Sequence, residues 1–223
     1  RQENQMKKLL RITAVSALIF GTGLSAAQAD VNVWRDHDTK LTVSYADTWR
    51  QINNQNPGDV LTIRAPGDNE FAECSVNIVD DGRFKIYPVH LSGAIQRLNF
   101  SQNYWADYLG RYNNVVVHEG TDNNGLGRGF ASMVSVSYET AKGAKMKKRA
   151  LGFVSHYRNH VYTVECSAEA SAYHKWHNAF LNVIKSVDFH QGTNFAPSGY
   201  YRNFFQDKTL KVRGPQLFED TYH

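Results

Sequence analysis

Residues 161–189, VYTVECSAEASAYHKWHNAFLNVIKSVDF, decide the fold of this chain. In the first part, Tyr162, Val164 and Cys166 alternate with polar residues, which is the two-residue period of a strand with one buried face. The second part has apolar residues three and four positions apart, which form one stripe along a helix. These residues are Tyr173, Trp176, Phe180, Val183 and Val187. The stretch therefore predicts a strand followed by a helix that packs on a sheet.

The chain before this stretch contains short alternating runs separated by polar turns, which predict further strands. The predicted strands cover residues 30–35, 41–45, 60–64, 74–79, 115–119, 128–138, 149–157 and 161–168. Turns are expected at Asn123-Asn124-Gly125 and near Lys142-Gly143.

A second helix of about 20 residues is predicted to begin at Ser92. Its apolar face consists of Ile95, Leu98, Trp105, Leu109 and Tyr112. The order of strands, helix, strands and helix favours an α+β fold over alternating parallel units. The sequence thus predicts an antiparallel β-sheet covered by two amphipathic helices.

Residues 1–29 have the features of a secretory signal peptide, with residues 1–5 as an upstream extension. A basic start at 6–11 precedes a mostly apolar run at 12–24, and Ala27-Gln28-Ala29 is a cleavage motif. The apolar run is shorter than the roughly 20 residues of a membrane-spanning helix. We expect cleavage after Ala29, a periplasmic or secreted bacterial protein, and no transmembrane segment in the mature chain.

The charge of the mature chain gives little support for a nucleic-acid partner. The net charge of the whole sequence is +4, but residues 1–29 hold four basic residues and one acidic residue. Without them the net charge falls to +1, so much of the basic excess belongs to the leader.

The two cysteines, Cys74 and Cys166, are predicted to form a disulfide. Each lies in the tripeptide Glu-Cys-Ser and in phase with the apolar residues of its strand. If the strands are neighbours, both side chains point to the same side of the sheet, and the periplasm is oxidising. The alternative is a pair of buried free thiols.

Residues 190–223 differ in character from the α+β domain at 30–189. They are rich in aromatic residues, namely Phe195, Tyr200, Tyr201, Phe204, Phe205, Phe218 and Tyr222. A disordered linker is poor in such residues, so this C-terminal tail is expected to pack on folded protein. Its own domain is favoured over a partner, because large uncovered aromatic patches are unusual on soluble monomers.

No motif of a known enzyme class is present: the sequence lacks G-x-S-x-G, H-E-x-x-H, C-x-x-C and G-x-x-x-x-G-K. His174 and His177 are three residues apart, and His160 or His190 could add a third metal ligand. The neighbours of His174 are polar, as on a solvated helix face, so neither a metal nor a cofactor is expected.

A group of basic residues lies at the tip of a predicted hairpin. Its members are Lys142, Lys145, Lys147, Lys148 and Arg149. They could contact anionic lipid headgroups or an acidic partner. The alternative is that they keep the hairpin soluble and its edges unpaired.

Two segments resemble the PsbP-like fold family, which includes an extrinsic subunit of photosystem II, a Ran-binding import factor and small exported bacterial proteins. Residues 41–49, LTVSYADTW, resemble the opening strand and tryptophan of the family, and residues 178–189 resemble its closing helix. This chain has Ala46-Asp47 where the family often has a proline, and Asp30 where bacterial lipoproteins have a cysteine. The resemblance carries over no ligand residues, because members bind different partners on one scaffold.

Together these features predict an exported, periplasmic, non-enzymatic binding or accessory protein that acts on a protein or another envelope component. The alternative is a hydrolase with an unrecognised site centred on a histidine such as His156 or His160, because catalytic groups converge in space and not in sequence. A purely structural envelope component is a third possibility. The identity of a partner and the oligomeric state are not encoded in any motif of the chain.

Overall fold

The computed structural model describes residues 30–67, 69–141, 143–157 and 159–189, and all of these except Asp30 belong to one compact unit. The strands are β1 (Val31–Arg35), β2 (Leu41–Ala46), β3 (Arg50–Gln51), β4 (Asp59–Arg64), β5 (Glu73–Asp80), β6 (Asn113–Leu126), β7 (Gly129–Glu139), β8 (Lys147–Tyr157), β9 (His160–Glu169) and β10 (Asp188–Phe189). They form a three-stranded sheet in the order β1-β2-β10 and a seven-stranded sheet in the order β3-β4-β5-β9-β8-β7-β6. All neighbouring strands are antiparallel.

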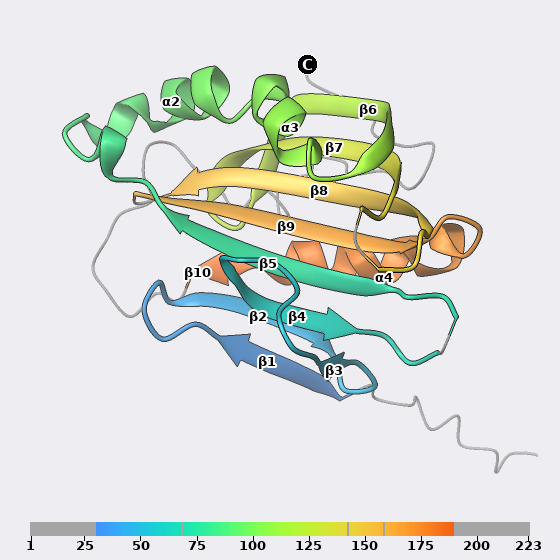
Figure 1. Ribbon diagram of the computed structural model, residues 1–223. Coiled ribbons are helices and arrows are strands. Elements are labelled where there is room, and N and C mark those ends of the chain that lie inside the picture. The colour runs from blue at the N-terminus through green and yellow to red at the C-terminus, as the bar shows by residue number, and fades with distance from the viewer. Residues whose placement is uncertain (1–29, 68, 142, 158, 190–223) are drawn as a thin grey trace, which may run out of the picture. The chain divides into compact units, whose positions relative to one another are not determined.

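Helices cover both faces of the seven-stranded sheet. Figure 1 shows α2 (Ser92–Asn99) and α3 (Gln102–Leu109) on one side and α4 (Tyr173–Ser186) on the other. Two 3-10 turns, η1 (Gly82–Phe84) and η2 (Val89–Leu91), connect β5 to α2. This arrangement confirms the predicted α+β class with an antiparallel sheet. No helix in the described ranges is long and apolar enough to cross a membrane.

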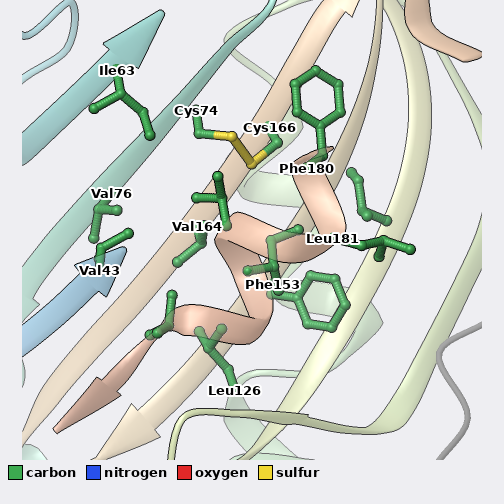
Figure 2. Close-up of a cluster of buried hydrophobic side chains, with 14 of the residues drawn as sticks. Val43, Ile63, Cys74, Val76, Leu126, Phe153, Val164, Cys166, Phe180 and Leu181 are labelled. Atoms are coloured by element: carbon green, nitrogen blue, oxygen red, sulfur yellow. A yellow bond between two sulfur atoms is a disulfide. The ribbon is translucent and has the colours of Figure 1, made fainter. Parts of the chain in front are cut away.

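The strand β9 pairs with β5 on one side and with β8 on the other. Cys74 lies directly opposite Cys166 in the β5–β9 register, and the two sulfurs form a disulfide. Figure 2 shows this bond near Val164 and beside Phe180 of α4. The alternation of apolar and polar residues in each strand had predicted that both cysteine side chains lie on the same face of the sheet. The structure confirms this prediction.

The face of the sheet that carries the disulfide is covered by α4 and the small sheet. Its core comprises Leu41, Val43, Leu61, Ile63, Val76, Met133, Leu151, Phe153, Tyr162, Val164, Phe180, Leu181 and Ile184, among others. Trp49 makes edge-to-face contacts with Trp176 and Phe180, at centroid distances of 5.9 and 6.3 Å. The buried stripe of α4 is wider than predicted, because His177, Leu181 and Ile184 are also buried.

The opposite face of β9 is buried as well, which corrects the prediction of a half-exposed strand. Thr163, Glu165 and Ser167 are all at most 7 % exposed. Thr163 and Glu165 are hydrogen-bonded to tyrosines of α3, and the apolar residues of α2 and α3 form a second core with β7, β8 and the start of β9. This core comprises Ile95, Phe100, Trp105, Leu109, Val134, Val136, Tyr138, Ala150, Val154 and Val161.

The predicted helix of about 20 residues is two helices, because the chain turns at Phe100 and Ser101. The buried Gln96 amide donates to the carbonyl oxygens of Phe100 and Val154, at 2.8 and 3.2 Å, which ties the end of α2 to β8. The turn buries Phe100 and starts α3 in a new direction. Leu98, which the periodicity placed on the apolar face, is consequently 78 % exposed.

The predicted turn at residues 123–125 lies inside the strand β6, which is longer than expected. The Asn124 amide donates to Thr121, and the β6–β7 register shifts between these two residues. The bulge thus lies at Asp122 and Asn123, and Asn124 and Gly125 continue the strand as partners of Ala131 and Phe130. The chain reverses three residues later, where Gly127 adopts a φ of 57°, a left-handed conformation that suits glycine.

The end of the described chain is attached to both sheets. Asp188 of β10 pairs with Thr42 of β2, and the Ser186 hydroxyl donates to the Ser44 carbonyl oxygen at 2.8 Å. The Arg128 Nε donates to Asp188 Oδ1 at 3.0 Å, which places β10 beside the β6–β7 turn.

Candidate functional site

The helix α3 separates two hollows on the outer surface of the second core. The larger one, here called the acidic pocket, has a volume of about 600 Å³ and lies between α3, the end of α2 and the end of β5. Its lining combines carboxylate, amide and aromatic side chains with one guanidinium. The lining residues are Val79, Asp80, Asp81, Gly82, Arg83, Asn99, Phe100, Asn103, Tyr104, Asp107 and Val161.

The smaller hollow, here called the apolar pocket, has a volume of about 420 Å³ and lies between α3 and β6. It is lined by Gln102, Trp105, Ala106, Leu109, Gly110, Tyr112, Val115, Val117 and Val134. Because β6 is the last strand of the sheet, one wall of this pocket is a sheet edge. Aliphatic side chains dominate the lining, so it suits an apolar group.

Close packing and hydrogen bonds hold α3 on the sheet. The Trp105 Nε1 donates to the Ser132 hydroxyl at 2.9 Å, and the Tyr104 hydroxyl bonds the Thr163 hydroxyl at 2.7 Å. A Cβ atom on Gly152 would lie only 2.9 Å from the Trp105 ring. The glycine in β8 is therefore required for the close approach of this indole.

A buried carboxylate lies under the C-terminal end of α3. Glu165 is 7 % exposed and accepts hydrogen bonds from three tyrosine hydroxyls. The donor distances are 2.8 Å for Tyr108, 3.0 Å for Tyr112 and 2.7 Å for Tyr138. We call these four residues the Glu165 cluster.

Burial, together with the charge of Glu165, keeps the tyrosine partners of this carboxylate protonated. Burial, followed by the nearby Glu165 charge, raises the pKa of Tyr108 and of Tyr138 well above the usual value. Tyr112 stacks on Tyr138 at 3.8 Å, and the Arg111 guanidinium lies 3.7 Å from the centroid of the Tyr108 ring. The cluster therefore joins α3 and the following loop to β7 and β9. It positions the helix between the two pockets.

The structure separates the members of the predicted basic group. Lys145 and Lys147 are exposed, whereas Lys142 lies outside the described residues. The Lys148 side chain is only 8 % exposed and bonds Glu73, and the Arg149 guanidinium packs 5.1 Å from the centroid of the Tyr173 ring. Lys148 and Arg149 thus take part in packing, whereas Lys145 and Lys147 are exposed to solvent.

The Lys148 contact belongs to a buried ion network at one end of β5. Arg64 donates to the other oxygen of Glu73 at 2.8 Å. Burial alone would raise the pKa of Glu73, but the charges and hydrogen bonds of Lys148 and Arg64 outweigh it and lower the pKa. Sequence reasoning missed this network because its members come from three separate strands.

The histidines singled out in the sequence differ in their environment. His174 is exposed and His177 is buried, with its Nδ1 3.0 Å from the Tyr173 hydroxyl. His160 lies at the start of β9, and His190 is outside the described residues. Across residues 30–189, where they are described, no three histidine, cysteine or acidic side chains gather closely enough to hold a metal ion.

His156, which the hydrolase hypothesis named, is packed between aromatic rings. Its ring stacks on Phe100 at 5.2 Å and meets Phe84 edge-on at 5.3 Å. It does not line either pocket.

A different histidine, His118, is hydrogen-bonded to a serine: its Nε2 is 2.7 Å from the Ser137 hydroxyl on the neighbouring strand. Only the β6–β7 register could reveal this pair.

Replacing His156 with phenylalanine is expected to reduce the loss of stability at mildly acidic pH. Burial lowers the pKa of His156 in spite of the nearby Asp81 charge. The unfolded chain, with a pKa of about 6.5 for this group, binds the proton more readily, so stability falls as the pH drops below that value. Urea unfolding at pH 7.5 and 5.5 measures how far the free energy of unfolding falls between the two pH values. In His156→Phe this fall should be smaller than in the wild type by on the order of 1 kcal/mol.

Some acid sensitivity should remain in that variant, since burial also lowers the pKa of His177 and of His118. An unchanged difference between the two pH values would contradict the assignment to His156.

Comparisons of the sequence with protein-family models and with curated proteins find no significant match. Solved structures do match. Cyanobacterial PsbP from Synechocystis sp. PCC 6803 is 14% identical, with a TM-score of 0.46 over 77% of this chain and 99% of that chain. LpqN of Mycobacterium tuberculosis, described as involved in cell envelope biogenesis, is 13% identical, with a TM-score of 0.45 over 72% of this chain and 91% of that chain. Both matches are likenesses of fold alone.

Proposed function

We propose that the protein is an exported, non-enzymatic binding or accessory protein that holds a protein or another envelope component on the surface around α3. The acidic pocket carries this proposal. It presents carboxylates, amides and aromatic rings from three separate segments of the chain at one place. Pockets with a few convergent polar groups among apolar ones are typical of ligand sites.

Contacts between α3 and the sheet beneath it hold the helix in place, as a binding surface on this helix requires. A binding surface on a helix is specific only if the helix is held in one position. The Glu165 cluster and the Trp105–Ser132 bond provide that restraint. The leader-like residues 1–29 and the disulfide support an oxidising location outside the cytoplasm.

Photo-crosslinking in cells of the natural host tests the proposal. A photoreactive benzoyl-phenylalanine replaces Asn103 in the acidic pocket, and in a control chain it replaces Asp38, whose side chain is 93% exposed on the β1–β2 hairpin. We expect a discrete adduct of higher mass from position 103 and none of that mass from position 38. Equal adducts from both positions, or none from position 103, would contradict the proposal.

The alternative of a hydrolase is favoured by one observation, the His118–Ser137 hydrogen bond, because a nucleophile needs a base within such a distance. It takes second place because neither residue lines either pocket. Labelling of Ser137 by a fluorophosphonate would reverse this order.

A further inference from the structure

We infer that residues 200–213 of the C-terminal tail bind in the acidic pocket of the same molecule. The inference goes beyond the proposed function, since it names an occupant that belongs to this chain and that the proposed partner displaces when it binds. It combines the charge of the pocket, the composition of the tail and the point at which the chain leaves the described part of the fold.

The pocket carries uncompensated negative charge. Asp81 is neutralised by Arg83, whose Nε and Nη2 atoms donate to its two carboxylate oxygens at 2.8 and 2.7 Å. Asp80 and Asp107 are exposed, and within the described ranges their carboxylates have no hydrogen bond or ion pair. Two carboxylates at the mouth of one hollow favour a cationic occupant.

Apolar surface lies next to these charges. Val79 is 51 % exposed although it lines the pocket, and the rings of Phe100 and Tyr104 form part of the wall. An occupant that covers this surface must therefore bring apolar or aromatic groups together with its positive charge.

The tail contains one segment with both properties. Residues 200–213, YYRNFFQDKTLKVR, have four aromatic residues, four basic residues and a single acid, so their net charge is +3. Residues 190–199 have no lysine, arginine or acid, and residues 214–223 have two acids and no lysine or arginine. Charge complementarity therefore selects the middle of the tail.

The tail begins at the end of the sheet where the pocket lies. Asp188 contacts Arg128 in the turn that precedes β7, and β7 begins at the end of the sheet where β5 finishes. Three strand-to-strand spacings, about 14 Å in all, separate β7 from β5 in the sheet. The face of the sheet covered by α4 and the face that carries the pocket are about one layer, or 10 Å, apart. The eleven residue-to-residue steps from Phe189 to Tyr200 can span about 36 Å when the chain is extended, which is enough.

Zero-length carbodiimide crosslinking of the full chain locates the tail. The reagent joins a lysine amine to a carboxylate in contact with it, so we expect Lys208 or Lys211 to be linked to Asp80 or Asp107. A mixture of isotope-labelled and unlabelled chains shows whether each link lies within one molecule. Links between molecules only, or equal links to the exposed control Asp38, would overturn the inference.

Hydrogen exchange of the same full chain measures what the contact contributes. In the variant Asp80→Asn/Asp107→Asn, amide exchange in residues 200–213 should rise about five-fold, as the loss of two surface ion pairs allows. The matched control Asp36→Asn/Asp38→Asn should leave it unchanged. Equal exchange in both variants would overturn the inference. Neither measurement needs a partner, so failure here is distinguishable from failure of the proposed function.

Discussion

Replacing both cysteines with alanine is expected to lower the free energy of unfolding by about 4 to 5 kcal/mol. The disulfide joins residues 92 positions apart, so its loss releases a long loop in the unfolded chain. Cys74 and Cys166 are both at most 1 % exposed, and alanine is preferred to serine because it leaves no buried hydroxyl. Urea unfolding of the wild type and of Cys74→Ala/Cys166→Ala measures the difference.

The wild-type protein unfolded in the presence of a reductant is the control, and its free energy of unfolding should approach that of the double variant. Both should fold to the same far-ultraviolet circular dichroism spectrum, because β5 and β9 are also joined by their ladder from residue 73 to residue 80. A loss below about 1 kcal/mol would show that the unfolded chain is restrained by something other than the disulfide.

Replacing Glu165 with alanine is expected to cost about 3 to 5 kcal/mol, because three tyrosine hydroxyls lose their acceptor in a buried place. The donors Tyr108 and Tyr138 come from different elements, so the substitution also loosens α3 from the sheet. Chemical unfolding gives the cost. The amides of α3 should exchange faster with solvent, because the helix and the loop after it each lose an attachment to the sheet.

Glu169→Ala is the matched control, since Glu169 ends the same strand but its carboxylate accepts hydrogen bonds from the nearby Ser171 and Ala172. It should cost less than about 1 kcal/mol. Tyr138→Phe removes one donor and leaves the carboxylate with two, so a smaller loss of about 1.5 to 3 kcal/mol is expected. If Glu165→Ala unfolds at the same urea concentration as the control, the cluster does not hold α3.

The course of the backbone was predictable where a local pattern reports burial on one face. The alternation around Cys74 and Cys166 predicted two strands in compatible phase, and the structure pairs these residues directly. The apolar stripe from Tyr173 to Val187 predicted a helix packed on the sheet, which α4 confirms. Both patterns depend only on the periods of strand and helix.

The pattern was misleading where a polar residue is buried by a distant segment. Glu165 alternates with apolar neighbours and was placed toward solvent, yet Tyr108 and Tyr112, more than 50 residues earlier, cover it. The break at Phe100 and Ser101 was missed for a similar reason, because the Gln96 amide finds its partner on β8. Lys148 was counted as a surface charge although its partner Glu73 lies on β5.

Strand and helix periods, the cysteine phase and the order of elements could all be read from neighbouring residues, because each depends on the geometry of a few consecutive peptide units. The acidic pocket, the Glu165 cluster and the His118–Ser137 pair depend on which segments meet across the sheet. Polar contacts between residues far apart in the sequence produce no periodic pattern of residue types along the chain. They exist only after hydrophobic burial has brought α3 onto β9 and set the register of β6 against β7.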